Sequence, residues 1–132
     1  MTTFRTSTSS TSDERLEGCQ ALRDAAAREI LGWQLNVVPW ASGADVQVWH
    51  DSSGTPMMPY QAWLPDMDDR QSMRLVQALT ALGYAFDLEV TQRVSRVRLS
   101  REGTAVSESA DQSWRHALIR ACAKIGATHR AR

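Results

Sequence analysis

The main pattern in the chain is the recurrence of apolar residues at intervals of three and four, the spacing of one face of an α-helix. It predicts amphipathic helices at residues 13–31, 66–82 and 111–125. Residues suited to helix capping open each stretch. A glycine follows each one, as at many helix ends: Gly32, Gly83 and Gly126. In the second helix, Asp66 is the predicted N-cap, and the predicted buried stripe is Met73, Val76, Leu79 and Leu82.

Between these helices, apolar and polar residues alternate, which is the pattern of strands with one buried face. Strands are predicted at residues 33–37, 45–50, 86–90 and 96–99, with further candidates at 60–64 and 104–107. Pro56 and Pro59 confine the 60–64 candidate to a sheet edge or a loop. Short turns between successive strands favour antiparallel pairs. We therefore expect an α+β fold, a three-layer α/β/α sandwich with a small, mainly antiparallel sheet and three helices.

The two ends of the chain differ in composition from the predicted domain, residues 13–127. Residues 1–12 are rich in serine and threonine and lack the apolar core of a secretory signal, so we expect a disordered arm. Residues 128–132 are expected to form a frayed basic tail. No apolar run approaches the roughly 20 residues of a membrane helix, so no membrane association is expected. The location expected for the chain is the cytoplasm.

Charge is distributed unevenly, although the formal net charge is zero. Residues 1–92 carry an acidic excess and residues 93–132 a basic one, and nearly all the basic residues are arginine. Arg96 and Arg98 share one face of a predicted strand, about 7 Å apart. Two guanidinium groups at that spacing suit a phosphate or an acidic surface. The alternative is a ladder of cross-strand ion pairs with Asp87 and Glu89. Nucleic acid is the less favoured partner, because a lysine-poor, alanine-rich composition also explains the arginines.

Tryptophan is abundant, with five residues in the chain and four of them between positions 33 and 63. Trp33 and Trp114 lie on apolar stripes and are expected in the core. Trp49 and Trp63 lie either under a helix or in an aromatic patch that contacts a partner. Trp40, in a loop with proline and glycine, is expected to be exposed. The candidate binding residues are therefore Trp40, Trp49, Trp63, Arg96 and Arg98.

Residues that signal catalysis or metal binding are sparse. Cys19 and Cys122 lie in separate predicted helices without a metal-binding spacing, and we expect reduced thiols unless those helices pack side by side. The aspartates at 66, 68 and 69 suit a helix N-terminus better than a metal site. No nucleophile turn or phosphate-binding glycine loop is present in the sequence. We expect no cofactor and no metal, and a hydrolase using Asp66, Asp68 and His50 is a remote alternative.

Four segments within residues 23–127 resemble the phage ABA sandwich domain family, whose members are small phage and prophage proteins. They are Ile30-Leu31-Gly32-Trp33, Trp63-Leu64-Pro65-Asp66-Met67-Asp68, Gly83-Tyr84-Ala85-Phe86 and Ala117-Leu118-Ile119-Arg120-Ala121-Cys122. The Ser/Thr-rich arm departs from the family, and so does the acidic start of the second helix, where members tend to have Ser-Thr-Asp. The resemblance implies an α/β/α sandwich and a viral origin, and it supplies no activity.

Together these features predict a small phage or prophage accessory protein that binds a host protein or a small nucleotide rather than acting as an enzyme. The alternative is a self-associating structural module, a homodimer held by an aromatic patch.

Overall fold

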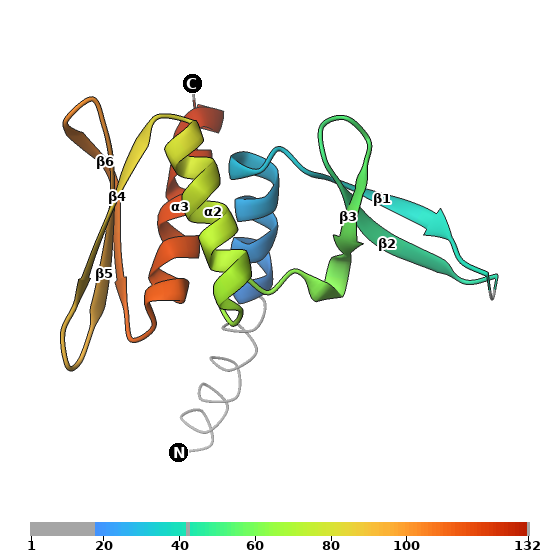
Figure 1. Ribbon diagram of the computed structural model, residues 1–132, viewed down its shortest axis with the longest axis horizontal. Coiled ribbons are helices and arrows are strands. Elements are labelled where there is room, and N and C mark those ends of the chain that lie inside the picture. The colour runs from blue at the N-terminus through green and yellow to red at the C-terminus, as the bar shows by residue number, and fades with distance from the viewer. Residues whose placement is uncertain (1–17, 42, 132) are drawn as a thin grey trace, which may run out of the picture.

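The computed structural model describes residues 18–41 and 43–131, shown as a ribbon in Figure 1. The predicted disordered arm at 1–12 and the first residues of the first predicted helix lie outside this part of the chain. Within it, no helix combines the length and apolar character needed to cross a bilayer.

Three long helical segments form the centre of the molecule. The first covers residues 18–25 and continues as a π-helical turn, η1 (Ala26–Ile30). The second is α2 (Asp69–Ala81) and the third is α3 (Trp114–Ala131). The predicted frayed tail is therefore helical as far as residue 131. The N-cap of α2 is Asp68, whose side chain accepts a hydrogen bond from the Gln71 backbone N–H, so the prediction of Asp66 as N-cap is wrong.

Six strands form two separate antiparallel sheets of three strands each. The first sheet has the order β1 (Gln34–Pro39), β2 (Asp45–His50) and β3 (Pro56–Pro59). The second has the order β4 (Tyr84–Val90), β5 (Ser95–Arg101) and β6 (Thr104–Asp111). Strand β3 lies at an edge of the first sheet, where a proline costs no ladder hydrogen bond. It ends before the predicted segment 60–64, most of which forms the short 3-10 helix η2 (Tyr60–Ala62).

The α+β class, the antiparallel pairing, the three helices and a layered arrangement are confirmed, but the strands are divided over two sheets, and the helices lie between these sheets rather than outside a single sheet as in the predicted α/β/α sandwich. Figure 1 shows the helices between the two sheets, so the layers run sheet, helices, sheet. The division arises because α2 follows the first sheet and carries the chain through the helical layer before β4 begins. The second sheet packs one face against α2 and α3 and buries Ser95, Val97 and Leu99 of β5, whereas the first sheet meets the helical layer mainly through the buried Trp49 side chain.

Apolar side chains fill both sides of the helical layer. Towards the first sheet, the Trp33 ring lies 6.4 Å from Trp49 and 5.0 Å from Trp63, measured between centroids. Towards the second sheet, buried side chains of α2 and α3 belong to the same core as buried residues of β5: Leu75, Leu79, Leu118, Ile119, Val97 and Leu99. The buried stripe of α2 passes through Ser72, Leu75 and Leu79, whereas Met73 and Leu82 are exposed. The predicted stripe is therefore rotated about the helix axis from the observed one.

Gly126 lies within α3 and does not end it, contrary to the prediction. A methyl group placed on Gly126 would overlap the Cγ atom of Glu29 and would lie 3.0 Å from its Cβ atom. The Cβ atom is fixed to the backbone of the first helix and cannot move away, and the Cγ atom can do so only if Glu29 changes its χ1 rotamer. The glycine therefore permits the close approach of the first and third helices.

We expect Gly126→Ala to destabilise the protein by about 1–3 kcal/mol, because overpacking at this contact outweighs the higher helix propensity of alanine. Urea denaturation measures the change. The matched control is Glu29→Ala, and in the Gly126→Ala/Glu29→Ala double variant the cost of the added methyl group should be smaller. A Gly126→Ala protein as stable as the wild type would contradict the close-approach role.

Candidate functional site

The tryptophans predicted as binding residues lie in two different environments. Trp49 and Trp63 are buried, at 0% and 1% exposure, and lie in the cluster around Trp33. The Arg28 guanidinium covers the Trp49 ring from the first helix, 5.7 Å from its centroid. Of the two alternatives for Trp49 and Trp63, the one in which they are covered as part of the core is therefore correct. Neither ring offers a surface for a partner to contact. Trp40 is 61% exposed, as expected for its loop.

The hairpin formed by β1 and β2 projects away from the helical layer and carries Trp40 near its tip (Figure 1). Two backbone hydrogen bonds join the described residues near this tip. The Trp40 N–H donates to the Ala44 carbonyl at 2.9 Å, and the Gly43 N–H donates to the Trp40 carbonyl at 2.8 Å. Val37 on β1 is also 61% exposed. We call residues 34–41 and 43–49 the hairpin arm, and its exposed apolar side chains include Trp40 and Val37.

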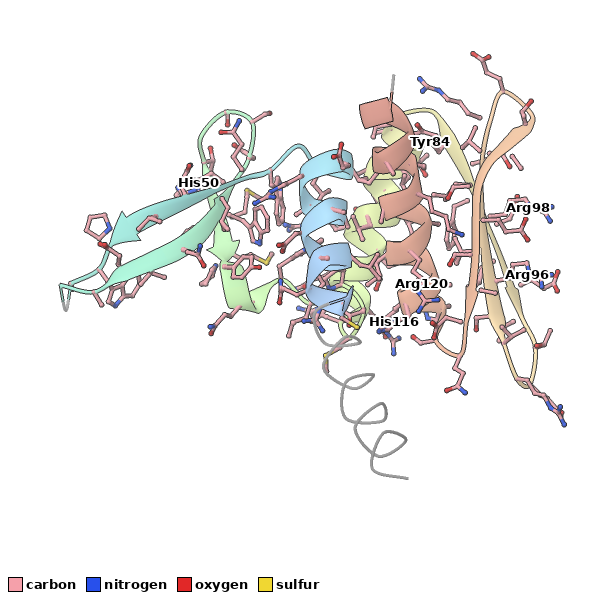
Figure 2. All side chains as sticks on the ribbon, turned by 180° about the vertical axis from the view of Figure 1, so that it is seen from behind. His50, Tyr84, Arg96, Arg98, His116 and Arg120 are labelled. Atoms are coloured by element: carbon pink, nitrogen blue, oxygen red, sulfur yellow. The ribbon has the colours of Figure 1, made fainter. Side chains whose placement is uncertain are left out.

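Arg96 and Arg98 point outward from the second sheet, away from the helices, as Figure 2 shows. Their Nε atoms lie 3.3 Å and 3.5 Å from the two carboxylate oxygens of Glu108 on β6. The β4–β5 register also places Asp87 opposite Arg98 and Glu89 opposite Arg96, as the ladder alternative predicted. Glu108 was missed because the predicted strand ended at residue 107. Three carboxylates surround two guanidinium groups, so this face does not favour an anion.

The residues of the remote hydrolase alternative do not come together. Asp68 caps α2, whereas the His50 Nδ1 atom lies 3.1 Å from the Val48 carbonyl within the first sheet. Asp66 is buried and belongs to a different set of residues. Among the described residues, the group of possible metal ligands that includes Asp66 contains Cys19 and His116 instead.

Cys19, Asp66 and His116 come from three separate segments: the first helix, the loop before α2, and the N-terminal part of α3. Their ligand atoms all lie within 4.8 Å of one another. The His116 Nε2 atom is 3.4 Å from the Cys19 Sγ atom and 3.6 Å from the Asp66 Oδ2 atom. The other ring nitrogen, Nδ1, is buried and has no hydrogen-bond partner among the described residues. Figure 2 labels His116, which lies near the start of α3 in the helical layer.

The cluster does not have the arrangement of a Cys-His-Asp catalytic triad. In a triad, the carboxylate holds one ring nitrogen and the nucleophile uses the other. Here, Cys19 and Asp66 face the same nitrogen of His116. The second cysteine, Cys122, is fully buried, and burial raises its pKa to about 12, which makes it a poor nucleophile at neutral pH. Cys19 and Cys122 do not form a disulfide with each other.

Arg23 holds the Asp66 carboxylate with two parallel hydrogen bonds, from Nε at 2.6 Å and from Nη2 at 2.9 Å. The side chains are only 16% and 3% exposed, respectively. Burial acts to raise the pKa of Asp66, but the hydrogen bonds and the charge of Arg23 outweigh it, so the pKa lies below its ordinary value. The carboxylate is therefore ionised at neutral pH, next to the thiol and the imidazole.

No local motif marks this cluster in the sequence, because its members are 47 and 50 residues apart along the chain. Comparisons of the chain with protein-family models, with curated proteins and with solved structures found no match.

We expect Asp66→Asn to destabilise the protein by about 3 kcal/mol at pH 7, because it leaves the Arg23 charge poorly compensated in a largely buried site. Urea denaturation measures the loss. The matched control is Asp69→Asn, because Asp69 forms a more exposed ion pair with Arg115 at 2.6 Å. That variant should lose less than about 1 kcal/mol. Equal losses in the two variants would contradict a special role for the buried pair.

The same ion pair predicts a pH dependence. Because the folded-state pKa of Asp66 is lowered from 3.8, its contribution is present above the unfolded-state pKa and is lost as the pH falls through the folded-state value. The stability difference between wild type and Asp66→Asn should therefore shrink below about pH 4. Unfolding free energies of both proteins, measured from pH 7 to pH 3, test this. A difference that stays constant would contradict the lowered pKa.

Proposed function

We propose that this protein acts by binding another protein, and that the hairpin arm is the contact surface. The observation that carries the proposal is the exposure of Trp40 near the tip of a projecting, hydrogen-bonded hairpin. Tryptophan is enriched among the residues that contribute most to protein–protein affinity. A fixed backbone also lowers the entropy lost when such a side chain enters a pocket.

The composition of the arm favours a protein over a nucleotide or nucleic acid. Residues 34–49 contain no lysine or arginine, and Asp45 is the only acidic residue there. Phosphate recognition needs cationic side chains or clustered backbone N–H donors, and nucleic-acid affinity depends on neutralising phosphates. The Arg96 and Arg98 face, the other candidate, has its two guanidinium charges matched by Glu108 together with Asp87 and Glu89. A small-nucleotide partner therefore has less support than a protein partner.

Strand β1 offers a specific way to bind. It is the edge strand of the first sheet, so one side of its backbone has no strand partner among the described residues. Proteins commonly guard such edges with charged residues, and β1 has none. We therefore propose that an extended strand of the partner adds to β1 while Trp40 enters an apolar pocket. The same edge supports the second candidate, a homodimer formed through β1.

The wider proposal is that of a non-enzymatic phage or prophage accessory protein in the cytoplasm, with a host protein as its partner. Its support is the sequence resemblance described above and the contact surface of the arm.

We expect Trp40→Ser and Val37→Lys each to abolish capture of the same host protein by the purified chain, by removing the anchor and by charging the edge. Quantitative mass spectrometry of the captured proteins measures the effect. The matched control is Val90→Lys, because Val90 is 65% exposed on β4, an edge strand of the second sheet. The control should retain the partner.

Light scattering separates the two candidates. A dimer that Val37→Lys converts to a monomer would identify a second copy as the partner. Identical captured proteins for the wild type and both arm variants, together with a wild-type monomer, would overturn the proposed function.

A further inference from the structure

We propose that Cys19, Asp66 and His116 bind a divalent transition metal, with Zn²⁺ as the natural ligand. The ligand atoms are the Cys19 Sγ, the Asp66 Oδ2 and the His116 Nε2. Thiolate, imidazole and carboxylate together are a donor set typical of zinc. This inference is independent of the proposed function, because the cluster lies in the helical layer and the hairpin arm does not contribute to it.

Two of the three distances within the cluster are close to the edges of a zinc tetrahedron. Zinc bonds to sulfur at about 2.3 Å and to nitrogen or oxygen at about 2.0–2.1 Å, so neighbouring ligand atoms lie roughly 3.3–3.6 Å apart. The measured separations from His116 Nε2 are 3.4 Å to Cys19 Sγ and 3.6 Å to Asp66 Oδ2. The third pair, the Cys19 Sγ atom and an Asp66 carboxylate oxygen, lies within 4.8 Å.

One hydrogen bond at the His116 Nε2 atom accounts for the contact with Cys19 at 3.4 Å but leaves the Asp66 oxygen, at 3.6 Å, beyond hydrogen-bond distance. A neutral ring nitrogen either donates or accepts one hydrogen bond. If the His116 Nε2 atom accepts a hydrogen bond from the Cys19 thiol, the lone pair of this nitrogen is used. The nitrogen then carries no proton that it could donate to the Asp66 oxygen at 3.6 Å. If Nε2 carries a proton, it has two competing acceptors. A cation at the centre would bond to the nitrogen, the sulfur and the oxygen together.

Arg23 supports the ligand role of Asp66. Its Nε atom bonds to Oδ1, the carboxylate oxygen that does not face His116, at 2.6 Å. Residues that hydrogen-bond a metal-binding carboxylate in this way orient it and keep it ionised. Oδ2 also accepts from Arg23 Nη2 at 2.9 Å, and a carboxylate oxygen has a second lone pair for the metal. A thiolate and a carboxylate as ligands supply two negative charges against Zn²⁺, and the nearby Arg23 leaves the site with a single net positive charge.

The side chains leave access from solvent for the metal and for a fourth ligand. The His116 side chain is 23% exposed, and Cys19 is partly exposed. Three protein ligands with an open fourth position are typical of zinc sites that hold water. The cluster thus predicts a site that zinc can enter from solvent and leave when a chelator is added.

The test is titration of the full chain, reduced and chelator-treated, with Co²⁺ as the spectroscopic probe and then with Zn²⁺. We expect visible d–d bands and a near-ultraviolet thiolate-to-cobalt band that saturate at one equivalent, and Zn²⁺ should displace Co²⁺. Zn²⁺ should also raise the melting temperature of the wild type. Binding should weaken as the pH falls, because protons compete for the ligands.

Three variants locate the site. Cys19→Ser should remove the thiolate band. His116→Gln should weaken binding at least tenfold, a loss typical even of residues that only orient a metal ligand. Cys122→Ala is the matched control, because it removes the buried thiol outside the cluster, and its titration should match the wild type. Melting curves without metal establish that each variant is folded.

The proposal is overturned if the wild type gives no thiolate-to-cobalt band, or if the band persists in Cys19→Ser. It is also overturned if binding is lost in a folded Cys122→Ala protein but retained in His116→Gln. None of these outcomes depends on the hairpin arm, so the metal site and the protein-binding proposal succeed or fail separately.

Discussion

The structure depends on the buried ion pair between Arg23 and Asp66. Taking a guanidinium and a carboxylate out of water costs several kcal/mol per ion, and only well-formed contacts offset that cost. Here two parallel hydrogen bonds do so, at 2.6 Å and 2.9 Å. The Arg23 carbonyl also accepts a hydrogen bond from the Trp63 indole N–H at 2.8 Å. One residue of the first helix therefore fixes both ends of the segment that leads into α2.

This attachment determines how the rest of the chain is arranged. Asp66 is held by Arg23 and does not cap the helix. The helix α2 therefore begins at Asp69, three residues later than the sequence predicts, and Asp68 provides its cap. Trp63 is directed into the cluster with Trp33 and Trp49, which joins the first sheet to the helices. The chain then crosses the helical layer through α2 and builds the second sheet on the other side.

Periodicity predicted most of the helices and strands because it depends on which face of each element is buried. It failed where two distant elements meet. Gly126 has the sequence context of a helix end, yet it lies inside α3 because the first helix passes close to it at Glu29. The predicted strand ended at residue 107 and left out Glu108, although Arg96 and Arg98 on β5 pair with Glu108 on the neighbouring strand β6. Neither contact leaves a trace in the residues next to it along the chain.

The three aspartates around the start of α2 show why the candidate site was missed as well. By local criteria Asp66, Asp68 and Asp69 are equivalent, since each suits a helix N-terminus. The structure gives them different partners: Asp68 caps the helix, Asp69 pairs with Arg115 on α3, and Asp66 is buried beside Arg23. Only Asp66 lies where the first helix and α3 both approach, so only Asp66 meets a thiol and an imidazole. Burial by neighbouring helices, which no local pattern encodes, separates a potential metal ligand from two ordinary surface carboxylates.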